Sequence, residues 1–328
     1  MLRKFQILLS VGVILTMAAC DKVSPPQYGC TNPLALNYDP DASLDDGNCE
    51  FDPSLLKGCT DTTAANYNPL AVIDDCHCRY DSVRTVLLED YTGFRCSNCP
   101  QAAEELKRIQ CTYGARVVPL AVHVSETFAA PENNPDGSFS TDFRTPIGNT
   151  YDAEFGNSLF LPNGLINRNE YDGLFPQLYN SWEGHVANIL AQPPEALIDL
   201  EVTYDQGTRE ATALLKVSAL VDMNAAPYRL VVLLSEDSIV DWQSDNRMNP
   251  PKVSDYVHMH ALRDGFTAAW GDPINAGGAM PSGFTETVSK SLVINPQYVD
   301  HNCHVVAFIF RDDTKQVIQA EYKPVIEE

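Results

Sequence analysis

Two cysteines three residues apart stand between an apolar run and a helical pattern, and this arrangement limits the folds open to the chain. Residues 83–91 form an apolar, branched run that predicts a buried strand. The segment Cys96-Ser97-Asn98-Cys99-Pro100 follows, and apolar residues then recur at helical spacing as far as Ile109. Residues 117–124 predict a second strand. Strand, CxxC, helix and strand in this order predict a βαβ unit.

The position of the cysteine pair at a predicted helix start has a chemical consequence. Backbone N–H groups and the helix dipole stabilise a thiolate at that end of a helix. We therefore expect Cys96 to be the exposed, attacking thiol and Cys99 the resolving one. The arrangement resembles the opening of a thioredoxin-like fold, which implies a cis-proline loop opposite the two cysteines. Pro162, just before the apolar pair Leu165-Ile166, is the candidate for that loop.

Other interpretations of these residues are weighed beside the redox one. A zinc site would need a second ligand pair, and the sequence contains no other CxxC. A static structural disulfide stays open as the stronger rival, because Ser97 and Asn98 differ from the fillings of well-known thioredoxins. His258 and His260 would face one side of a strand, where a metal pair or two solvated side chains are the alternatives.

The first twenty residues indicate export and lipidation. Arg3 and Lys4 precede an uncharged apolar run over residues 7–19, which is too short to span a bilayer and is typical of a signal peptide. The run ends in small residues before Cys20 and resembles a bacterial lipobox, so Cys20 is the expected lipidation site. Acyl chains on this residue would anchor the protein, since each buried methylene contributes about 0.8 kcal/mol. An ordinary signal peptide followed by a chance cysteine is the alternative.

An internal duplication follows the predicted tether. The segment Gly29-Cys30-Thr31 and the residues after it recur as Gly58-Cys59-Thr60 and its successors. The two units resemble the short Cys-bounded modules of secreted bacterial proteins, which are similar to thrombospondin type 3 repeats. Each unit is too small for its own core, and a bridge closing each loop would stabilise it by roughly 3 kcal/mol. The expected bridges are Cys30–Cys49 and Cys59–Cys78.

The first repeat gathers carboxylates along an irregular loop. Such oxygen ligands suit Ca²⁺, although aspartates are also plain turn formers and the spacing is not that of an EF-hand. The second repeat is a weaker calcium candidate, and Cys76 replaces Gly47 in it. The candidate ligands are Asp39, Asp41, Asp45 and Asp46.

The C-terminal half changes to a period of two. Residues 197–204 alternate, and about six or seven strands separated by polar turns are predicted as far as residue 322. This pattern predicts an antiparallel immunoglobulin-like sandwich. The connection over residues 241–282 is expected to form a surface lid or binding loop. Before this half, an amphipathic helix is predicted from Phe175 to Leu190, and a short helix over residues 147–155.

Charge and cysteine content bound the compartment and the partners. The formal net charge is -22, which argues against nucleic acid as a partner. Ten cysteines indicate disulfides formed outside the cytoplasm. No catalytic triad or phosphate-binding glycine loop stands out, and no cofactor is expected apart from Ca²⁺ at the repeats.

The segments VLLEDYTGFRCSNCP, PNGLINR and DYVHMHALRD together resemble the lipoprotein family related to the 28-kilodalton outer membrane protein. The resemblance covers roughly residues 81–328 and implies an outer-membrane lipoprotein with a thioredoxin-like domain and a β-rich C-terminal domain. Along the chain we expect a signal peptide (1–19), a tether (20–28), the two repeats (29–80), a thioredoxin-like domain (81–192) and a β-sandwich (193–328).

Two hypotheses of function follow. In the first, the chain exchanges thiols and disulfides with envelope proteins through Cys96 and Cys99, with Pro162 beside them. In the second, it is a binding or structural lipoprotein whose CxxC is a structural bond. In both, the chain is held at the outer membrane by lipid on Cys20 and faces the periplasm or the cell surface.

Overall fold

The computed structural model describes residues 27–52, 57–157, 160–224 and 227–327. The predicted signal peptide, Cys20 and most of the tether lie outside the described residues. The chain divides into two compact units, one ending at Leu56 and one beginning at Lys57. Among the described residues, no helix has the length and apolar character needed to cross a membrane.

The duplicated sequence produces two copies of one small fold. In the first unit, β1 (Tyr28–Gly29) pairs in parallel with β2 (Leu44–Asp45). In the second unit, β3 (Lys57–Gly58) pairs in parallel with β4 (Ile73–Asp74) in the matching register. The predicted Cys30–Cys49 and Cys59–Cys78 disulfides are both present, each with a sequence separation of 19.

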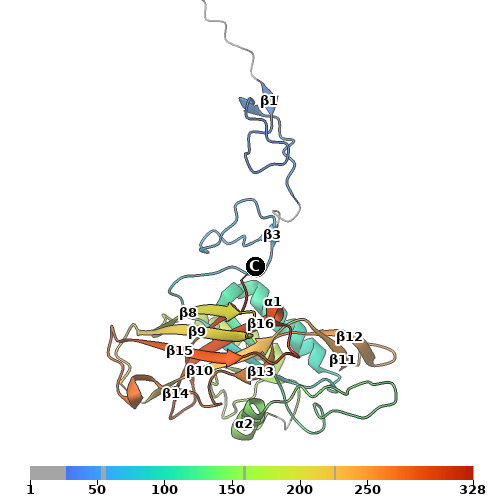
Figure 1. The fold of residues 1–328 in the computed structure, drawn as a ribbon, viewed down its shortest axis with the longest axis vertical. Coiled ribbons are helices and arrows are strands. Elements are labelled where there is room, and N and C mark those ends of the chain that lie inside the picture. Colours follow the sequence, from blue (N-terminus) through green and yellow to red (C-terminus); the bar gives the residue numbers. More distant parts are fainter. Residues whose placement is uncertain (1–26, 53–56, 158–159, 225–226, 328) are drawn as a thin grey trace, which may run out of the picture. The chain divides into compact units, whose positions relative to one another are not determined.

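An eight-stranded sheet forms the centre of the second unit, in the order β17-β16-β10-β13-β6-β5-β7, with β14 paired to β10 (Figure 1). Strands β5 and β6 are parallel, and β7 is antiparallel to β5. The strand bounds are β5 (Val86–Thr92), β6 (Val117–His123), β7 (Asn163–Ile166), β10 (Tyr228–Glu236), β13 (Ala261–Gly265), β14 (Asp272–Pro273), β16 (Cys303–Arg311) and β17 (Val317–Pro324).

Because side chains alternate along each strand, the two faces of this sheet pack into different hydrophobic cores. One face packs against α2 (Pro146–Phe155). The opposite face is covered over β5, β6 and β7 by α1 (Cys99–Tyr113) and α3 (Trp182–Leu190). Over β10 and β16 it is covered instead by a three-stranded antiparallel sheet of β8 (Ala196–Asp205), β9 (Glu210–Ala219) and β15 (Thr285–Val293). A separate hairpin joins β11 (Ile239–Ser244) to β12 (Lys252–His258).

The expectation of a self-contained sandwich after residue 193 differs from the structure. Strands β10, β13, β16 and β17 extend the sheet of β5, β6 and β7, and the junction is the parallel pair Ala261↔Ala121. The expected loop over residues 241–282 also differs, because it contains β12, β13 and β14. Local periodicity does not predict which strands pair when they are so far apart in the sequence.

Two helix predictions fare differently. The short helix expected over residues 147–155 is confirmed by α2, whose N-cap Thr145 accepts a hydrogen bond from the Gly148 N–H. The helix expected from Phe175 begins only at Trp182, after a 3-10 turn over Tyr179–Ser181.

A buried ion pair ties the sheet together. Glu89 of β5 and Arg168, just after β7, are both fully buried, and two hydrogen bonds of 2.8 and 2.7 Å join them. The Arg168 guanidinium also lies 4.2 Å from the Tyr151 ring of α2 and 4.8 Å from the Phe308 ring of β16. One charged side chain therefore contacts both halves of the sheet and a covering helix.

We expect Arg168→Leu to lower the free energy of unfolding by about 3–5 kcal/mol, because it leaves Glu89 buried without a partner. Denaturant unfolding measures this loss. The double variant Glu89→Leu/Arg168→Leu should lose less than Arg168→Leu alone. Arg108→Leu, which removes ion pairs on the surface, is the control and should cost at most about 1 kcal/mol. Equal losses for Arg108→Leu and Arg168→Leu would contradict the role of the buried pair.

Candidate functional site

The CxxC pair lies where β5 gives way to α1. Cys99 is the first residue of α1, Pro100 sits in its first turn, and a disulfide joins Cys96 to Cys99. The Cys99 N–H donates to the Cys96 carbonyl at 3.2 Å. The approach to the pair is tight at Gly93, where an added Cβ would lie 2.5 Å from the Phe128 carbonyl oxygen.

Both cysteines are buried, with 2% of each residue exposed. The expectation that Cys96 is the more exposed thiol is therefore wrong for this conformation. A thiolate must reach a sulfur atom to attack it, so the covering groups decide what this disulfide can do.

The β11–β12 hairpin, residues 239–258, covers the cysteine loop; we call it the cover hairpin. The Gln243 side-chain amide donates to the Cys96 carbonyl at 3.0 Å and to the Gly93 carbonyl at 3.4 Å. The Ser244 N–H donates to the Phe94 carbonyl at 2.7 Å, and the Asn246 N–H to the Ser97 carbonyl at 3.0 Å. Backbone and side chain of the hairpin thus bind the loop along its length.

An ion-pair network fastens the tip of the cover hairpin to the first turns of α1. Arg247 forms a bidentate pair with Glu104 at 2.8 Å and also binds Asp245 at 2.7 Å. The side chain of Arg247 is 39% exposed, so the network contributes little stability and can open at small cost.

Aromatic rings hold the inner side of the cover hairpin. Trp242 packs beside Phe139, and Phe139 stacks on Phe94 with ring centroids 5.6 Å apart. His258 at the end of β12 lies 5.7 Å from His123 of β6, and burial lowers the pKa of His258 to about 4. Both imidazoles are therefore neutral near pH 7 and behave as packing groups.

The expected His258–His260 pair is not brought together. His258 Nε2 lies 3.2 Å from the Trp242 carbonyl oxygen. His260 follows a turn and lies instead between Asp237, at 3.0 Å, and Gln110, at 3.1 Å. The two rings serve different parts of the fold.

A buried carboxyl group, Asp90, lies on β5 and was not singled out by the sequence. It is on the sheet face of Val86 and Leu88, which pack against α1. Burial raises the pKa of Asp90 to about 7, and its Oδ1 has no hydrogen-bond partner among the described residues. Asp90 also lies close enough to the cover hairpin to act on Tyr256 of β12. The pKa of Tyr256 is raised to about 12, first by burial and then by the Asp90 charge.

The signal that could have revealed Asp90 is the pair of adjacent acids inside an apolar strand. Neighbouring strand residues face opposite sides, so one partner cannot serve both. Glu89 takes Arg168, and Asp90 is left without a cation.

Pro162 lies at the neighbouring strand. The Leu161–Pro162 bond is cis, and Asn163 of β7 is paired with Tyr91, next to the end of β5. Pro162 is buried. Because it directly precedes Asn163, it lies near the end of β5 from which the cysteine loop leaves the sheet.

Comparison with known proteins now identifies the family. The family model of the outer membrane protein Omp28 matches residues 148–328, which is more than half of the chain. The chain belongs to the Omp28 family. No curated protein matches it.

Two solved structures are compared with this chain, and the first of them is similar to it in fold. The structure of HBP35 of Porphyromonas gingivalis is similar over 74% of this chain and 76% of that chain, with 17% identity and a TM-score of 0.55. A domain of the outer membrane lipoprotein Omp28 from Porphyromonas gingivalis covers 40% of this chain and 88% of its own length, with 15% identity and a TM-score of 0.28.

The two repeats precede the matched region of this Omp28 family member. Their aspartates serve as turn acceptors: Asp39 accepts from the Asp41 N–H at 2.9 Å, and Asp45 from the Gly47 N–H at 2.8 Å. Among described residues, the group close enough to share a metal ion is Cys59, Asp74 and Cys78, not the four predicted aspartates. Because both cysteines are oxidised, this group offers no thiolate, and calcium in the first repeat stays a prediction.

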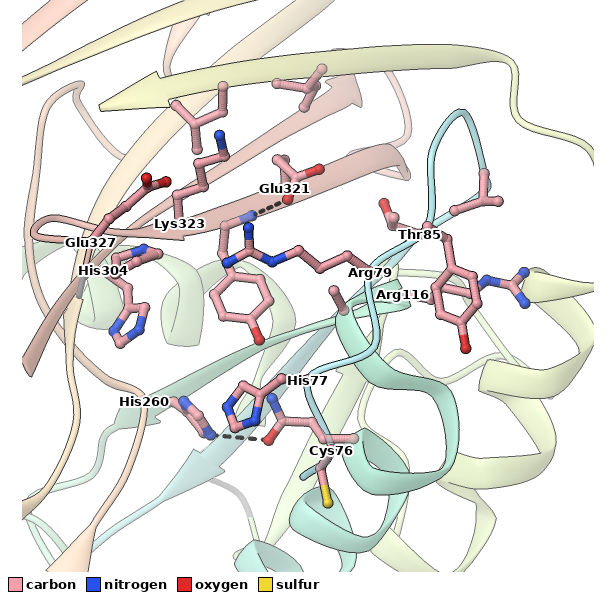
Figure 2. Close-up of a pocket in the computed structure, with 18 of the residues that line it drawn as sticks. Cys76, His77, Arg79, Thr85, Arg116, His260, His304, Glu321, Lys323 and Glu327 are labelled. Atoms are coloured by element: carbon pink, nitrogen blue, oxygen red, sulfur yellow. Dashed lines mark hydrogen bonds between the residues drawn. The ribbon is translucent and has the colours of Figure 1, made fainter. Parts of the chain in front are cut away.

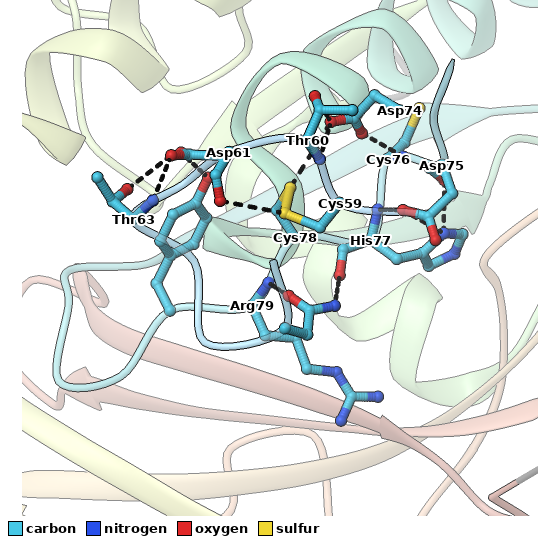
Figure 3. The surroundings of a disulfide bond; sticks show 12 residues. Cys59, Thr60, Asp61, Thr63, Asp74, Asp75, Cys76, His77, Cys78 and Arg79 are labelled. Atoms are coloured by element: carbon cyan, nitrogen blue, oxygen red, sulfur yellow. Dashed lines mark hydrogen bonds and ion pairs between the residues drawn. A yellow bond between two sulfur atoms is a disulfide. The ribbon is translucent and has the colours of Figure 1, made fainter. Parts of the chain in front are cut away.

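The second repeat uses the same turn chemistry (Figure 3). Asp74 accepts from the Thr60 hydroxyl at 2.7 Å and from the Cys76 N–H at 2.7 Å. Cys76 forms a disulfide with Cys111 of α1, while Cys303 is a buried free thiol whose pKa burial raises to about 12.

The raised pKa of Asp90 predicts a pH-dependent stability. The folded state holds a proton on Asp90 up to about pH 7, whereas the unfolded state releases it near 3.8, so stability falls as pH rises between these values. Asp90→Asn should remove that fall and gain up to about 4 kcal/mol relative to wild type above pH 7. Denaturant unfolding at pH 4 to 8 measures it, with Asp255→Asn on the exposed side of β12 as control. A gain that is the same at every pH would show that Asp90 does not titrate in this range.

Proposed function

We propose that this Omp28 family member is a cell-envelope lipoprotein whose thioredoxin-like half exchanges thiols and disulfides through Cys96 and Cys99. The order β6-β5-β7, with α1 and α3 on one face, supports the thioredoxin-like assignment. The family supports location at the outer membrane. The lipid on Cys20 and the orientation at the membrane belong to the proposal.

The observation that carries the redox assignment is the buried Asp90 on the α1 side of the sheet. An uncompensated buried carboxyl costs free energy, and a structural disulfide has no use for one. Exchange does have a use for it. When the reduced Cys96 thiolate attacks a partner disulfide, it forms a mixed disulfide and releases one partner thiolate. Cys99 then attacks the Cys96 sulfur and releases the second partner thiolate, and a nearby group must take the Cys99 proton. A carboxyl group with a pKa of about 7 can accept and return that proton.

In this proposal the cover hairpin controls access to the Cys96–Cys99 disulfide. A partner reaches Cys96 only when the hydrogen bonds from Gln243, Ser244 and Asn246 are released. Local opening of this kind has its own free energy, smaller than that of global unfolding.

A second candidate is a non-catalytic envelope lipoprotein with a structural CxxC bond. The 2% exposure of each cysteine favours it. The reduction potential separates the two. A value between about -270 and -120 mV agrees with exchange, and a value below about -300 mV agrees with a structural bond.

The variant Gln243→Ala/Arg247→Ala tests whether the cover hairpin controls access to Cys96. It removes hydrogen bonds worth roughly 0.5–1.5 kcal/mol each, so reduction of Cys96–Cys99 and the reduction of insulin should both speed up about tenfold or more. Arg144→Ala, which removes ion pairs elsewhere on the surface, is the control. If insulin reduction stays no faster than with free dithiol in both proteins, the structural candidate is preferred.

Lipidation is tested in cells with labelled palmitate. We expect wild type to incorporate label and fractionate with outer membranes, and Cys20→Ser to lose both. Equal labelling of Cys20→Ser would refute the lipobox assignment, whatever the activity of the CxxC pair.

A further inference from the structure

A second disulfide links α1 to another part of the chain. Cys76 of the second repeat is bonded to Cys111, in the last turn of the helix that begins at Cys99. The bond lies on the surface: Cys111 is exposed and Cys76 is half-buried. By contrast, no more than 5% of Cys59, Cys78, Cys96 or Cys99 is exposed.

The first repeat shows what the loop looks like without this cysteine. Gly47 occupies the equivalent position with φ 75°, and Cys76 has φ 65°. Residues with a Cβ pay roughly 1–2 kcal/mol for this left-handed conformation, which glycine adopts freely. The first repeat keeps the same strand pairing and the same closing disulfide with glycine there. Cys76 therefore raises the free energy of the loop, and the loop folds without it in the first repeat. We infer that the role of Cys76 is its disulfide with Cys111.

That bond holds the repeat beside a cavity of about 1300 Å³. Residues of β8, β16 and β17 line one side of the cavity, and the second repeat lines another with Asp75, Cys76, His77, Arg79 and Tyr80. Figure 2 shows Cys76, His77 and His260 at the lower part of this cavity, with Glu321 and Lys323 across from them.

Non-covalent contacts also join the repeat to the residues at the end of α1. The Ala115 N–H donates to the Cys78 carbonyl at 2.8 Å, and the Arg116 guanidinium lies 5.9 Å from the Tyr80 ring. The disulfide adds a covalent link to these non-covalent contacts between the repeat and the helix end.

We propose that Cys76–Cys111 is a redox-cleavable strap, cut by a small or protein dithiol, that controls how firmly the second repeat closes the cavity. A thiolate of the dithiol attacks the exposed Cys111 sulfur, and Cys76 leaves as a thiolate that takes a proton from water. The second thiol of the dithiol then attacks the dithiol's first sulfur atom, which is bonded to Cys111 in the mixed disulfide. Cys111 is released reduced, and the dithiol ends as a cyclic or intramolecular disulfide. Activity at Cys96 is not required for this step.

The order of reduction tests the proposal in the full-length oxidised protein. Samples are exposed to a dithiothreitol series, free thiols are alkylated, and each cysteine is quantified by mass spectrometry. We expect Cys76 and Cys111 to be labelled at least tenfold faster than Cys59, Cys78, Cys96 and Cys99. Labelling of Cys76 and Cys111 together with or after Cys59 and Cys78 would overturn the proposal.

A matched variant separates loss of the strap from damage to the repeat. Cys76→Gly/Cys111→Ser restores the residue that the first repeat has at this position, so the repeat should keep its Cys59–Cys78 bond. Without reductant, we expect amide hydrogen exchange over residues 75–81 and 114–116 to be about tenfold faster than in oxidised wild type. Reduced wild type should match it. Unchanged exchange in the variant would mean that the bond restrains nothing, and the strap would be refuted even if it is reduced first.

Discussion

The ion pair of Glu89 and Arg168 is the interaction on which the second unit most depends. A buried guanidinium is tolerated only where its charge is met, and here a carboxylate meets it within the sheet while aromatic rings from α2 and β16 surround it. The residue before it, Asn167, binds the backbone of Leu87 through its side chain and accepts from the Val317 N–H. Two neighbouring residues thus fix β5, β7 and β17 against one another.

Local chemistry could be read from the sequence, and distant pairing could not. The strand before Cys96, the helix after it, the α2 helix and the two repeat disulfides follow from spacing and periodicity. The joining of β13 to β6 does not, because a single pair between distant segments decides it. The burial of Cys96 could not be predicted either, because the cover hairpin that buries it lies far along the chain. The sequence of that hairpin contains turn residues and has no clear periodicity.

Two adjacent acids in β5 show how strongly position decides chemistry. Glu89 points toward a cation and serves the architecture, whereas Asp90 points toward the helix side, where burial favours its neutral form. The alternation of a strand separates a structural charge from a titratable group by a single residue. The same helix side also carries a disulfide at each end of α1, one covered and one open to solvent.

The continuous sheet has a consequence for the order of folding. Several of its paired strands are far apart in the chain, namely β13 with β6, β10 with β16 and β5 with β7. Contacts of that kind form slowly because long loops must close first. The four disulfides among the described residues are local, with sequence separations of 3, 19, 19 and 35. Covalent links can therefore form early within short segments, whereas the sheet is complete only after β16 and β17 have paired. Early local pairing protects a cysteine-rich chain from mispairing during the slow assembly of its core.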